Sequence, residues 1–216
     1  MPDLRIQVAD TKAVPFAAIP TLGFPLEITN LAPNEEIHTI ALRCQIQIEV
    51  TRRSYTPREQ ARMLDLFGAP ERWGRTLRNL LWVQTSVVVP GFKGTATVAD
   101  MNVPCTFDFN VAATKYFEGL ATGEIPLLML FSGTVFYTSQ ENSLQVAPIS
   151  WELEARCRVP LTTWREMMSA YYPNLVWIHL HRDTFDRLYQ YKIEHGIPTW
   201  EQALEQLLAS ETVVQS

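Results

Sequence analysis

The sequence lacks the features that mark nucleic-acid-binding, membrane-spanning and secreted proteins. It has no basic excess, because 18 Lys and Arg stand against 23 Asp and Glu and give a net charge of −5, whereas a nucleic-acid partner usually requires a basic face. No apolar run approaches the roughly 18 residues of a membrane-spanning helix. The first residues, MPDLRIQVAD, contain no basic region followed by an apolar one, so no signal peptide is expected. We therefore expect no nucleic-acid partner, no membrane span and a cytoplasmic location.

Cysteine is scarce, and the residue patterns of common active sites are missing. Cys44, Cys105 and Cys157 are an odd number at wide spacing, which favours reduced, buried thiols over a disulfide framework. Neither CxxC nor HExxH occurs. Ser132, in FSGT, lacks the flanking glycines of a nucleophile elbow, and GFKGTAT lacks the spacing of a phosphate-binding loop. The sequence therefore predicts a protein that is not an enzyme, with no catalytic residues and no cofactor.

The first two thirds of the chain show a strong two-residue periodicity. In IALRCQIQIEV, alternate positions are apolar and would face a core, namely Ile40, Leu42, Cys44, Ile46, Ile48 and Val50. The residues between them are Ala41, Arg43, Gln45, Gln47 and Glu49. This pattern is typical of a half-buried antiparallel strand. LRIQVA, LWVQTSVVVP and GFKGTATVAD predict further strands.

Four more segments predict strands with particular positions in a sheet. Pro25 places TLGFPLEITN at a sheet edge, because proline cannot donate a ladder hydrogen bond. CTFDFNV, which begins at Cys105, alternates and predicts a strand. IPLLMLFSGTVFY is apolar on both faces, as expected of a covered central strand, with Gly133 at a bulge. LQVAPISWELEARCRV predicts the last long strand.

Helix signals occur in an insertion between strands. TPRE puts Thr56 at the N-cap, Pro57 at the first helical position and Glu59 in a capping box. Gly68 ends this helix. APERWG and TLRNLL predict further short helical turns, so the insertion covers residues 56–80.

The last third of the chain predicts three helices with recognisable caps. TTWREMMSAYYPN has Thr163 and Glu166 at capping-box spacing. RDTFDRLYQYKIEHG is expected to be capped by Asp183. PTWEQALEQLL has Thr199 at the N-cap with Gln202 three residues later.

Together these elements predict an α+β fold in which helices pack on an antiparallel sheet. We expect a single domain over residues 1–210. It is mainly β over 1–160, with the helical insertion at 56–80, and helical over 161–210. Residues 211–216 are expected to be a disordered tail.

Two polar pairs are candidates for chemistry. Asp108 and Lys115 lie near each other in the sequence, and a structural polar pair that holds a central hairpin and its helix is favoured over a catalytic one. His179 and His181 form His-x-His, which on a strand places both imidazoles on one face. A zinc or nickel site needs a third ligand, and none occurs at a recognisable spacing. These histidines are therefore weak metal candidates, with Cys157 as an added ligand.

Aromatic residues are numerous and suggest a surface that binds another protein. Trp164, Tyr171, Tyr172 and Trp177 fall close together around one predicted helix end. Aromatic rings bury a large area at modest entropic cost, which makes them common interface anchors. We expect these four residues to bind a partner.

Seven long segments make the chain resemble a bacterial family described as a domain of unknown function and seen mainly in actinobacteria. The segments, between about Leu4 and Leu208, are IHTIALRCQIQIE, LFGAPERWGRTLRNLLW, VPGFKG, VPCTFDFNVAATKYFEGLATGEIPLLMLFSGTVFY, WREMMSAYYPN, RDTFDRLYQYK and PTWEQALEQLL. The family has no established activity or catalytic residues. Its genes tend to lie beside those for uptake NiFe-hydrogenases and their maturation proteins, which implies an accessory or assembly role.

A second likeness is to the secretion chaperone SecB, which also combines a long-stranded antiparallel sheet with C-terminal helices and binds unfolded chains. WREMM, Pro173 and FDRL are similar to its C-terminal pattern. The sequence departs from that pattern in its shorter spacing from RE to Pro173, its later FDRL, the missing Pro-Val pair before Phe185 and the helical insertion. The likeness implies a SecB-like arrangement of sheet and helices.

From the residues and the resemblance we expect a non-enzymatic accessory protein, a chaperone-like or scaffolding factor that binds a hydrogenase subunit or another protein. Two alternatives stay open, a metal-handling maturation factor for nickel or zinc and a structural subunit of a hydrogenase complex. An enzyme for an unidentified small molecule would need a closed pocket around Asp108. Self-association into a homo-oligomer is also left open.

Overall fold

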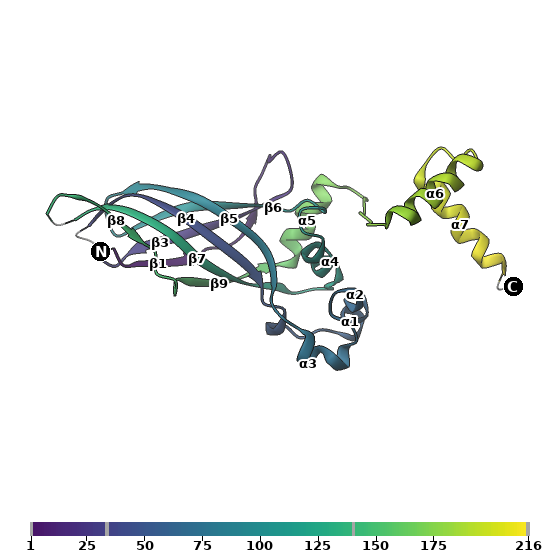
Figure 1. The fold of residues 1–216 in the computed structure, drawn as a ribbon, viewed down its shortest axis with the longest axis horizontal. Coiled ribbons are helices and arrows are strands. Elements are labelled where there is room, and N and C mark those ends of the chain that lie inside the picture. The colour runs from purple at the N-terminus through teal and green to yellow at the C-terminus, as the bar shows by residue number, and fades with distance from the viewer. Residues whose placement is uncertain (1, 33–34, 140, 215–216) are drawn as a thin grey trace. The chain divides into compact units, whose positions relative to one another are not determined.

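The chain folds into two compact units that contain helices and antiparallel strands (Figure 1). The computed structural model describes residues 2–32, 35–139 and 141–214. The units are Met1–Leu175 and Val176–Ser216, which we call the sandwich unit and the helical unit. The predicted α+β class is confirmed. The predicted single domain over residues 1–210 differs from this division, because the chain separates after Leu175.

The first sheet contains four antiparallel strands with β3 in its centre. Its members are β1 (Leu4–Val8), β2 (Lys12–Ala13), β3 (Thr21–Asn30) and β6 (Ala96–Pro104). β6 pairs along one side of β3, and β1 and β2 pair in turn along the other. The prediction that Pro25 lies at a sheet edge is therefore wrong.

Pro25 fits in this central strand because the neighbouring strand is interrupted beside it. β1 ends opposite Leu26, and β2 begins opposite Gly23. The carbonyl of Pro25 accepts a hydrogen bond from the Ala9 N–H at 2.9 Å, so the nitrogen of Pro25 faces the same interrupted side. The missing N–H group of proline consequently leaves no ladder acceptor without its donor.

The second sheet contains five antiparallel strands and confirms the strongest sequence pattern. Its members are β4 (Glu36–Ile48), β5 (Leu80–Phe92), β7 (Glu124–Thr138), β8 (Leu144–Pro148) and β9 (Glu154–Pro160). β4 lies between β5 and β7, and its even-numbered residues from Ile40 to Ile48 are buried as predicted. The predicted last long strand is instead two strands, β8 and β9, separated by a loop that carries Trp151.

The two sheets enclose one hydrophobic core, and a close backbone contact explains Gly133. Gly133 has a φ of 141°, and a Cβ atom there would lie 2.0 Å from the carbonyl oxygen of Ala41. Its register opposite Leu42 is regular, so the predicted bulge at Gly133 is wrong. The irregularity lies in β4, between Ile37 and Thr39.

The helical insertion lies beyond one end of the strands (Figure 1). It comprises η1 (Val50–Arg52), α1 (Pro57–Arg62), α2 (Leu64–Phe67), η2 (Pro70–Arg72) and α3 (Trp73–Thr76). The capping box is confirmed, because Thr56 and Glu59 exchange side-chain-to-backbone hydrogen bonds. Gly68 ends α2 with a φ of 70°. TLRNLL is not helical beyond Thr76, the last residue of α3, since the chain is extended at Leu77 and enters β5 at Leu80.

CTFDFNV, predicted as a strand, forms the turn that leads into α4 (Val111–Gly119). The side chain of Asn110 accepts a hydrogen bond from the Ala113 N–H at 3.0 Å and so caps the helix. Its amide group donates to the carbonyls of Leu81 and Trp82 on β5. The segment is therefore a helix cap anchored to a sheet edge.

The helix α5 (Leu161–Tyr171) packs on the sandwich, as predicted for the C-terminal helices. It follows β9 directly, and the Leu161 N–H donates a hydrogen bond to the Gly123 carbonyl at 2.9 Å. The predicted N-cap at Thr163 is therefore wrong, because Thr163 already lies in the first turn. The buried face of α5 consists of Leu161, Trp164, Met167 and Met168.

The helical unit contains α6 (Arg182–Glu194) and α7 (Trp200–Val214), which contact each other. His181, not Asp183, is the N-cap of α6. The predicted cap of α7 is confirmed, since Oγ1 of Thr199 accepts a hydrogen bond from the Gln202 N–H at 3.2 Å. α7 continues to Val214, so the predicted tail 211–216 overlaps this helix, and residues 215–216 lie outside the described residues.

Candidate functional site

Asp108 and Lys115 are not brought together as a pair. Nζ of Lys115 lies 3.1 Å from Oδ2 of Asp65 on α2, and both side chains are substantially exposed. Asp108 is exposed in the turn before α4. Lys115 therefore links α4 to α2 through a weak surface ion pair. The arrangement offers no acid–base geometry, because the two predicted groups have different surroundings.

The four aromatic residues expected to bind a partner are spread over both units. Trp164 is buried in the core. Tyr171 and Tyr172 are half-buried at the end of α5, where the Tyr171 hydroxyl donates to a backbone carbonyl at 2.6 Å and the Tyr172 ring packs on Phe107. Of the four, Trp177 alone belongs to the helical unit. Trp164 therefore lies in the core of the sandwich unit, and the other three residues are divided between the two units.

All three cysteines are free, and their thiols are poor nucleophiles. Burial raises the pKa of the Cys44, Cys105 and Cys157 thiols to about 12. A thiol with such a pKa holds almost no thiolate at neutral pH. Cys44 and Cys105 are packing residues, as the sequence predicted, and Cys157 is poorly suited to bind a metal.

A buried polar centre holds the helical insertion against the sandwich. Glu59 is 2% exposed, and its carboxylate accepts hydrogen bonds from the Ala121 N–H at 2.8 Å, the Thr56 N–H at 2.8 Å and the Arg53 guanidinium at 2.7 Å. Burial by itself would raise the pKa of Glu59, but these hydrogen bonds outweigh it and lower the pKa to about 2. Both carboxylate oxygens are engaged by protein donors, so this centre is structural. The sequence predicted only its capping-box half.

A polar hollow of about 580 Å³ lies on the outer face of the second sheet. Its side-chain lining includes Arg43, Gln45, Gln84, Ser86, Ser132 and Trp151. The ionisable groups among its lining residues are one guanidinium and the buried thiol of Cys44. Burial raises the pKa of the Cys44 thiol to about 12, which leaves almost no thiolate at neutral pH, so the hollow is unsuited to nucleophilic chemistry.

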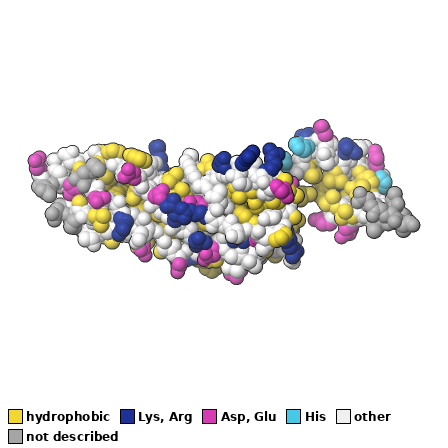
Figure 2. Space-filling model, turned by 90° about the horizontal axis from the view of Figure 1, so that it is seen from below, with side chains coloured by type: hydrophobic (Ala, Val, Ile, Leu, Met, Phe, Trp, Pro, Cys, Tyr) yellow, Lys and Arg dark blue, Asp and Glu magenta, His cyan; other side chains and the backbone are white. Residues whose placement is uncertain are grey.

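The helical unit contains a hollow of about 640 Å³, which we call the apolar groove. One wall is the extended segment before α6, with Val176, Trp177, Ile178, His179 and Leu180. The other wall comes from α6 and α7, with Arg182, Phe185, Leu188, Trp200, Glu201 and Leu204. Hydrophobic side chains gather on the face of this unit that Figure 2 shows.

The helical unit has almost no core of its own. Of its described hydrophobic residues, only Ile197 and Ala203 are buried. Ten large ones are exposed by 37% to 85%, namely Val176, Trp177, Ile178, Leu180, Phe185, Tyr189, Ile193, Leu204, Leu207 and Leu208. Soluble monomers rarely leave large contiguous apolar surfaces open, so this surface is a candidate interaction site.

Trp200 connects the two helices of this unit. Its ring centroid lies 5.4 Å from that of Phe185 and 5.9 Å from that of Tyr189, and the Lys192 ammonium lies 5.5 Å from its ring. Phe185 and Trp200 are not among the site residues that the sequence predicts. The helical spacing of Phe185, Leu188 and Tyr189 is visible in the sequence, but it equally fits a helix that packs on the sheet.

His179 and His181 share one face of the extended segment. Their ring centroids are 6.4 Å apart, and the Trp177 ring lies 6.0 Å from that of His179. In the part of the chain that the structure describes, no three His, Cys, Asp or Glu side chains lie together so that they could hold a metal ion. Two imidazoles alone do not make a zinc or nickel site. No helix among the described residues has the length and apolar character needed to cross a bilayer.

Comparison with known proteins assigns a family. A search of curated proteins found no match. Solved structures with similarity include the CARDB domain of a Pyrococcus furiosus protein in complex with di-metal ions (12% identity, 74% of this chain and 92% of that chain, TM-score 0.29). A putative late embryogenesis abundant protein (12%, 74% and 73%, TM-score 0.35) and the putative ApaA protein from Bordetella pertussis (12%, 74% and 94%, TM-score 0.28) are also similar. Values this low carry no argument about the present chain. The model of a family of unknown function (DUF6084) matches residues 1–216, and the chain therefore belongs to this family.

Proposed function

We propose that this protein is a non-enzymatic assembly or scaffolding factor whose helical unit associates with protein chains through the apolar groove. One observation carries the proposal: this unit of about 40 residues, a size that rarely sustains a core alone, exposes ten large hydrophobic side chains and buries only two described hydrophobic residues. The groove supplies concave apolar surface without an acid–base pair or nucleophile. Protein association is the function that fits this chemistry best.

Closing the groove would contribute a large part of the binding energy. A fully buried Leu, Ile or Phe side chain contributes about 1.5–3 kcal/mol relative to an exposed one. Phe185 and Trp200 line the groove and contact each other, so we expect them to be the main anchors. Trp177, from the predicted aromatic set, lines the same groove.

The complex that this protein serves is, on the resemblance described above, that of a NiFe-hydrogenase. A chaperone-like assembly factor binds an immature subunit and leaves before the enzyme is complete. A structural subunit stays in the mature enzyme. An apolar groove fits both roles, and the persistence of the association separates them.

Affinity capture of the tagged full-length protein from its native host tests the proposal. We expect a hydrogenase subunit among the captured proteins and its loss with Phe185→Asp. The matched control is Trp151→Asp, which changes an 85% exposed aromatic residue of the sandwich unit and should leave capture unchanged. An immature subunit alone supports an assembly factor, and the mature heterodimer in fixed ratio supports a structural subunit. Wild-type capture without any hydrogenase protein, or capture equal in Phe185→Asp, contradicts the proposal.

A further inference from the structure

The segment 176–181, VWIHLH, is an extended stretch without a partner strand. Its alternating β-branched, aromatic and aliphatic residues favour a strand. Within the described residues, the backbone groups of 176–180 form no hydrogen bond with another backbone group. An extended segment with unpaired N–H and C=O groups is a ready template for pairing with another strand.

The two faces of this segment differ in character. The rings of Trp177, His179 and His181 follow one another at centroid distances of 6.0 and 6.4 Å, so these residues share one face. Val176, Ile178 and Leu180 alternate with them and belong to the other face. Pairing the segment would therefore create a ribbon with one wholly aliphatic side.

We infer that a second copy of this chain occupies the apolar groove. The 176–181 segments of two copies pair as an antiparallel two-stranded ribbon, and the α6–α7 hairpins of both copies pack against it. The order strand, helix, helix is that of ribbon–helix–helix dimers. In such dimers neither chain completes a core alone, which is the condition of this unit. The inference shares with the proposed function only the premise that the groove is a protein–protein contact. It assigns the groove to a second copy, so a hydrogenase subunit would enter the groove only by displacing that copy.

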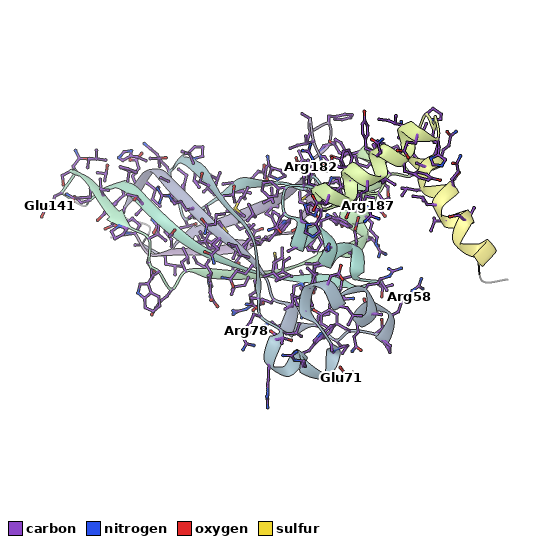
Figure 3. The ribbon with its side chains drawn as sticks, turned by 45° about the vertical axis from the view of Figure 1, so that its right-hand side comes forward. Arg58, Glu71, Arg78, Glu141, Arg182 and Arg187 are labelled. Atoms are coloured by element: carbon purple, nitrogen blue, oxygen red, sulfur yellow. The ribbon has the colours of Figure 1, made fainter. Side chains whose placement is uncertain are left out.

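Charge favours a second copy over other occupants. The segment VWIHLH has no acidic or basic residue apart from its histidines, so two copies can lie opposite each other without like-charge repulsion. α6 carries both signs in balance along its first two turns, with Arg182 and Arg187 (Figure 3) beside Asp183 and Asp186. Residues 176–216 have six acidic and three basic residues. A net charge of −3 disfavours nucleic acid, which ribbon dimers of this type often bind.

A two-fold axis restricts the register of the ribbon. Residues directly opposite each other in an antiparallel pair project from the same face. A symmetric pair keeps Val176, Ile178 and Leu180 of both copies on one face when the axis passes between the two copies of one residue, either Ile178 or His179. The aliphatic side of the ribbon then closes both grooves, and each dimer presents two sandwich units.

Light scattering with size-exclusion chromatography of the purified full-length protein at micromolar concentration tests this inference. The expected mass is twice that of the chain. Ile178→Pro removes a strand N–H and should give a monomer, whereas Ile178→Val should remain a dimer. A monomeric wild-type protein overturns the inference, and so does a folded Ile178→Pro variant that stays dimeric.

Cross-linking gives a reading that does not depend on the proline variant. His179→Cys places a thiol at or beside the two-fold axis, and a short bifunctional thiol reagent should join two copies. Trp151→Cys is the control, because its side chain is exposed on the sandwich unit. The native thiols react slowly, since burial raises their pKa to about 12. Equal cross-linking of the two variants overturns the inference.

The two experiments separate the inference from the proposed function. A dimer that captures no hydrogenase protein leaves the inference standing and removes the proposed complex. A monomer that still captures a hydrogenase subunit through Phe185 overturns the inference and leaves the proposed function in place.

Discussion

Phe24 of the sandwich unit is fully buried between two sheets, whereas Phe185 of the helical unit is 40% exposed on α6. Both belong to amphipathic elements of the kind that normally cover a core. In the sandwich unit the chain supplies both layers, and strands from each sheet bury their apolar faces against one another. In the helical unit the chain supplies one layer only. Apolar patterning therefore identifies a face that must be covered, and it does not say whether the same molecule covers it.

Replacing a phenylalanine by alanine in each unit should give the largest difference in the free energy of unfolding. Phe24→Ala is expected to lower the free energy of unfolding by about 3–5 kcal/mol, because it leaves a cavity beside Trp82. Phe185→Ala should leave unfolding of the sandwich unit unchanged and weaken association of the helical unit. Urea unfolding followed by circular dichroism measures the first effect, and light scattering measures the second. Equal losses of stability would contradict the distinction between the units.

Within the sandwich unit, a close contact between two backbone segments should contribute almost as much to the free energy of unfolding as the volume of a core side chain. Gly133→Ala forces a Cβ atom toward the Ala41 carbonyl at a φ of 141°, and we expect it to reduce the free energy of unfolding by about 3 kcal/mol. Gly74→Ala in α3 is the control, since its Cβ would meet no atom within 4 Å. That control should be neutral or slightly stabilising. The thermal unfolding midpoints of the wild type, Gly133→Ala and Gly74→Ala measure these effects.

The buried carboxylate of Glu59 should make the stability of the sandwich unit depend on pH. Hydrogen bonds hold its folded-state pKa at about 2, below its ordinary value of 4.5. A depressed pKa stabilises the fold above the ordinary value, and this stabilisation is lost as the pH falls from 4.5 through 2. Glu59→Gln should therefore cost up to about 3 kcal/mol at neutral pH and progressively less in acid.

Unfolding of wild type and Glu59→Gln in urea across this pH range is the measurement. Glu71→Gln, on the exposed surface of the insertion (Figure 3), is the matched control and should follow the wild type. A difference between wild type and Glu59→Gln that stays constant down to pH 2 would mean that the charge of Glu59 is not what stabilises the insertion.

Local rules were sufficient where one short segment decides the structure. The alternation in β4 requires only that one face be buried, and the capping box at Thr56 and Glu59 involves neighbours in the sequence. Both could be predicted. The position of Pro25 in a central strand could not be predicted, because that strand accepts a proline only where its neighbouring strand is interrupted. The turn at 105–111 alternates like a strand, but Asn110 anchors it to β5, which is distant in the sequence.

The candidate site was predictable only in its residue types. Aromatic abundance suggested an interface, yet Trp164 belongs to the core and Trp177 to the groove, although both lie in the same stretch of sequence. The sequence does not show that the chain divides after Leu175. It therefore could not show that α6 and α7 lie outside the unit to which α5 belongs.

The surface ion pair on α6 should have the smallest effect. Nε of Arg182 lies 3.1 Å from both carboxylate oxygens of Asp186, and both side chains are largely exposed. Such pairs contribute about 0.3–0.5 kcal/mol each, and the proposed dimer carries two of them, so Asp186→Asn should change its dissociation constant by less than about sixfold. Analytical ultracentrifugation of wild type, Asp186→Asn and Phe185→Ala ranks the two contributions. If Asp186→Asn dissociated the dimer as fully as Phe185→Ala, charge would hold the helical unit together, and its exposed apolar residues would no longer explain why it needs a second layer.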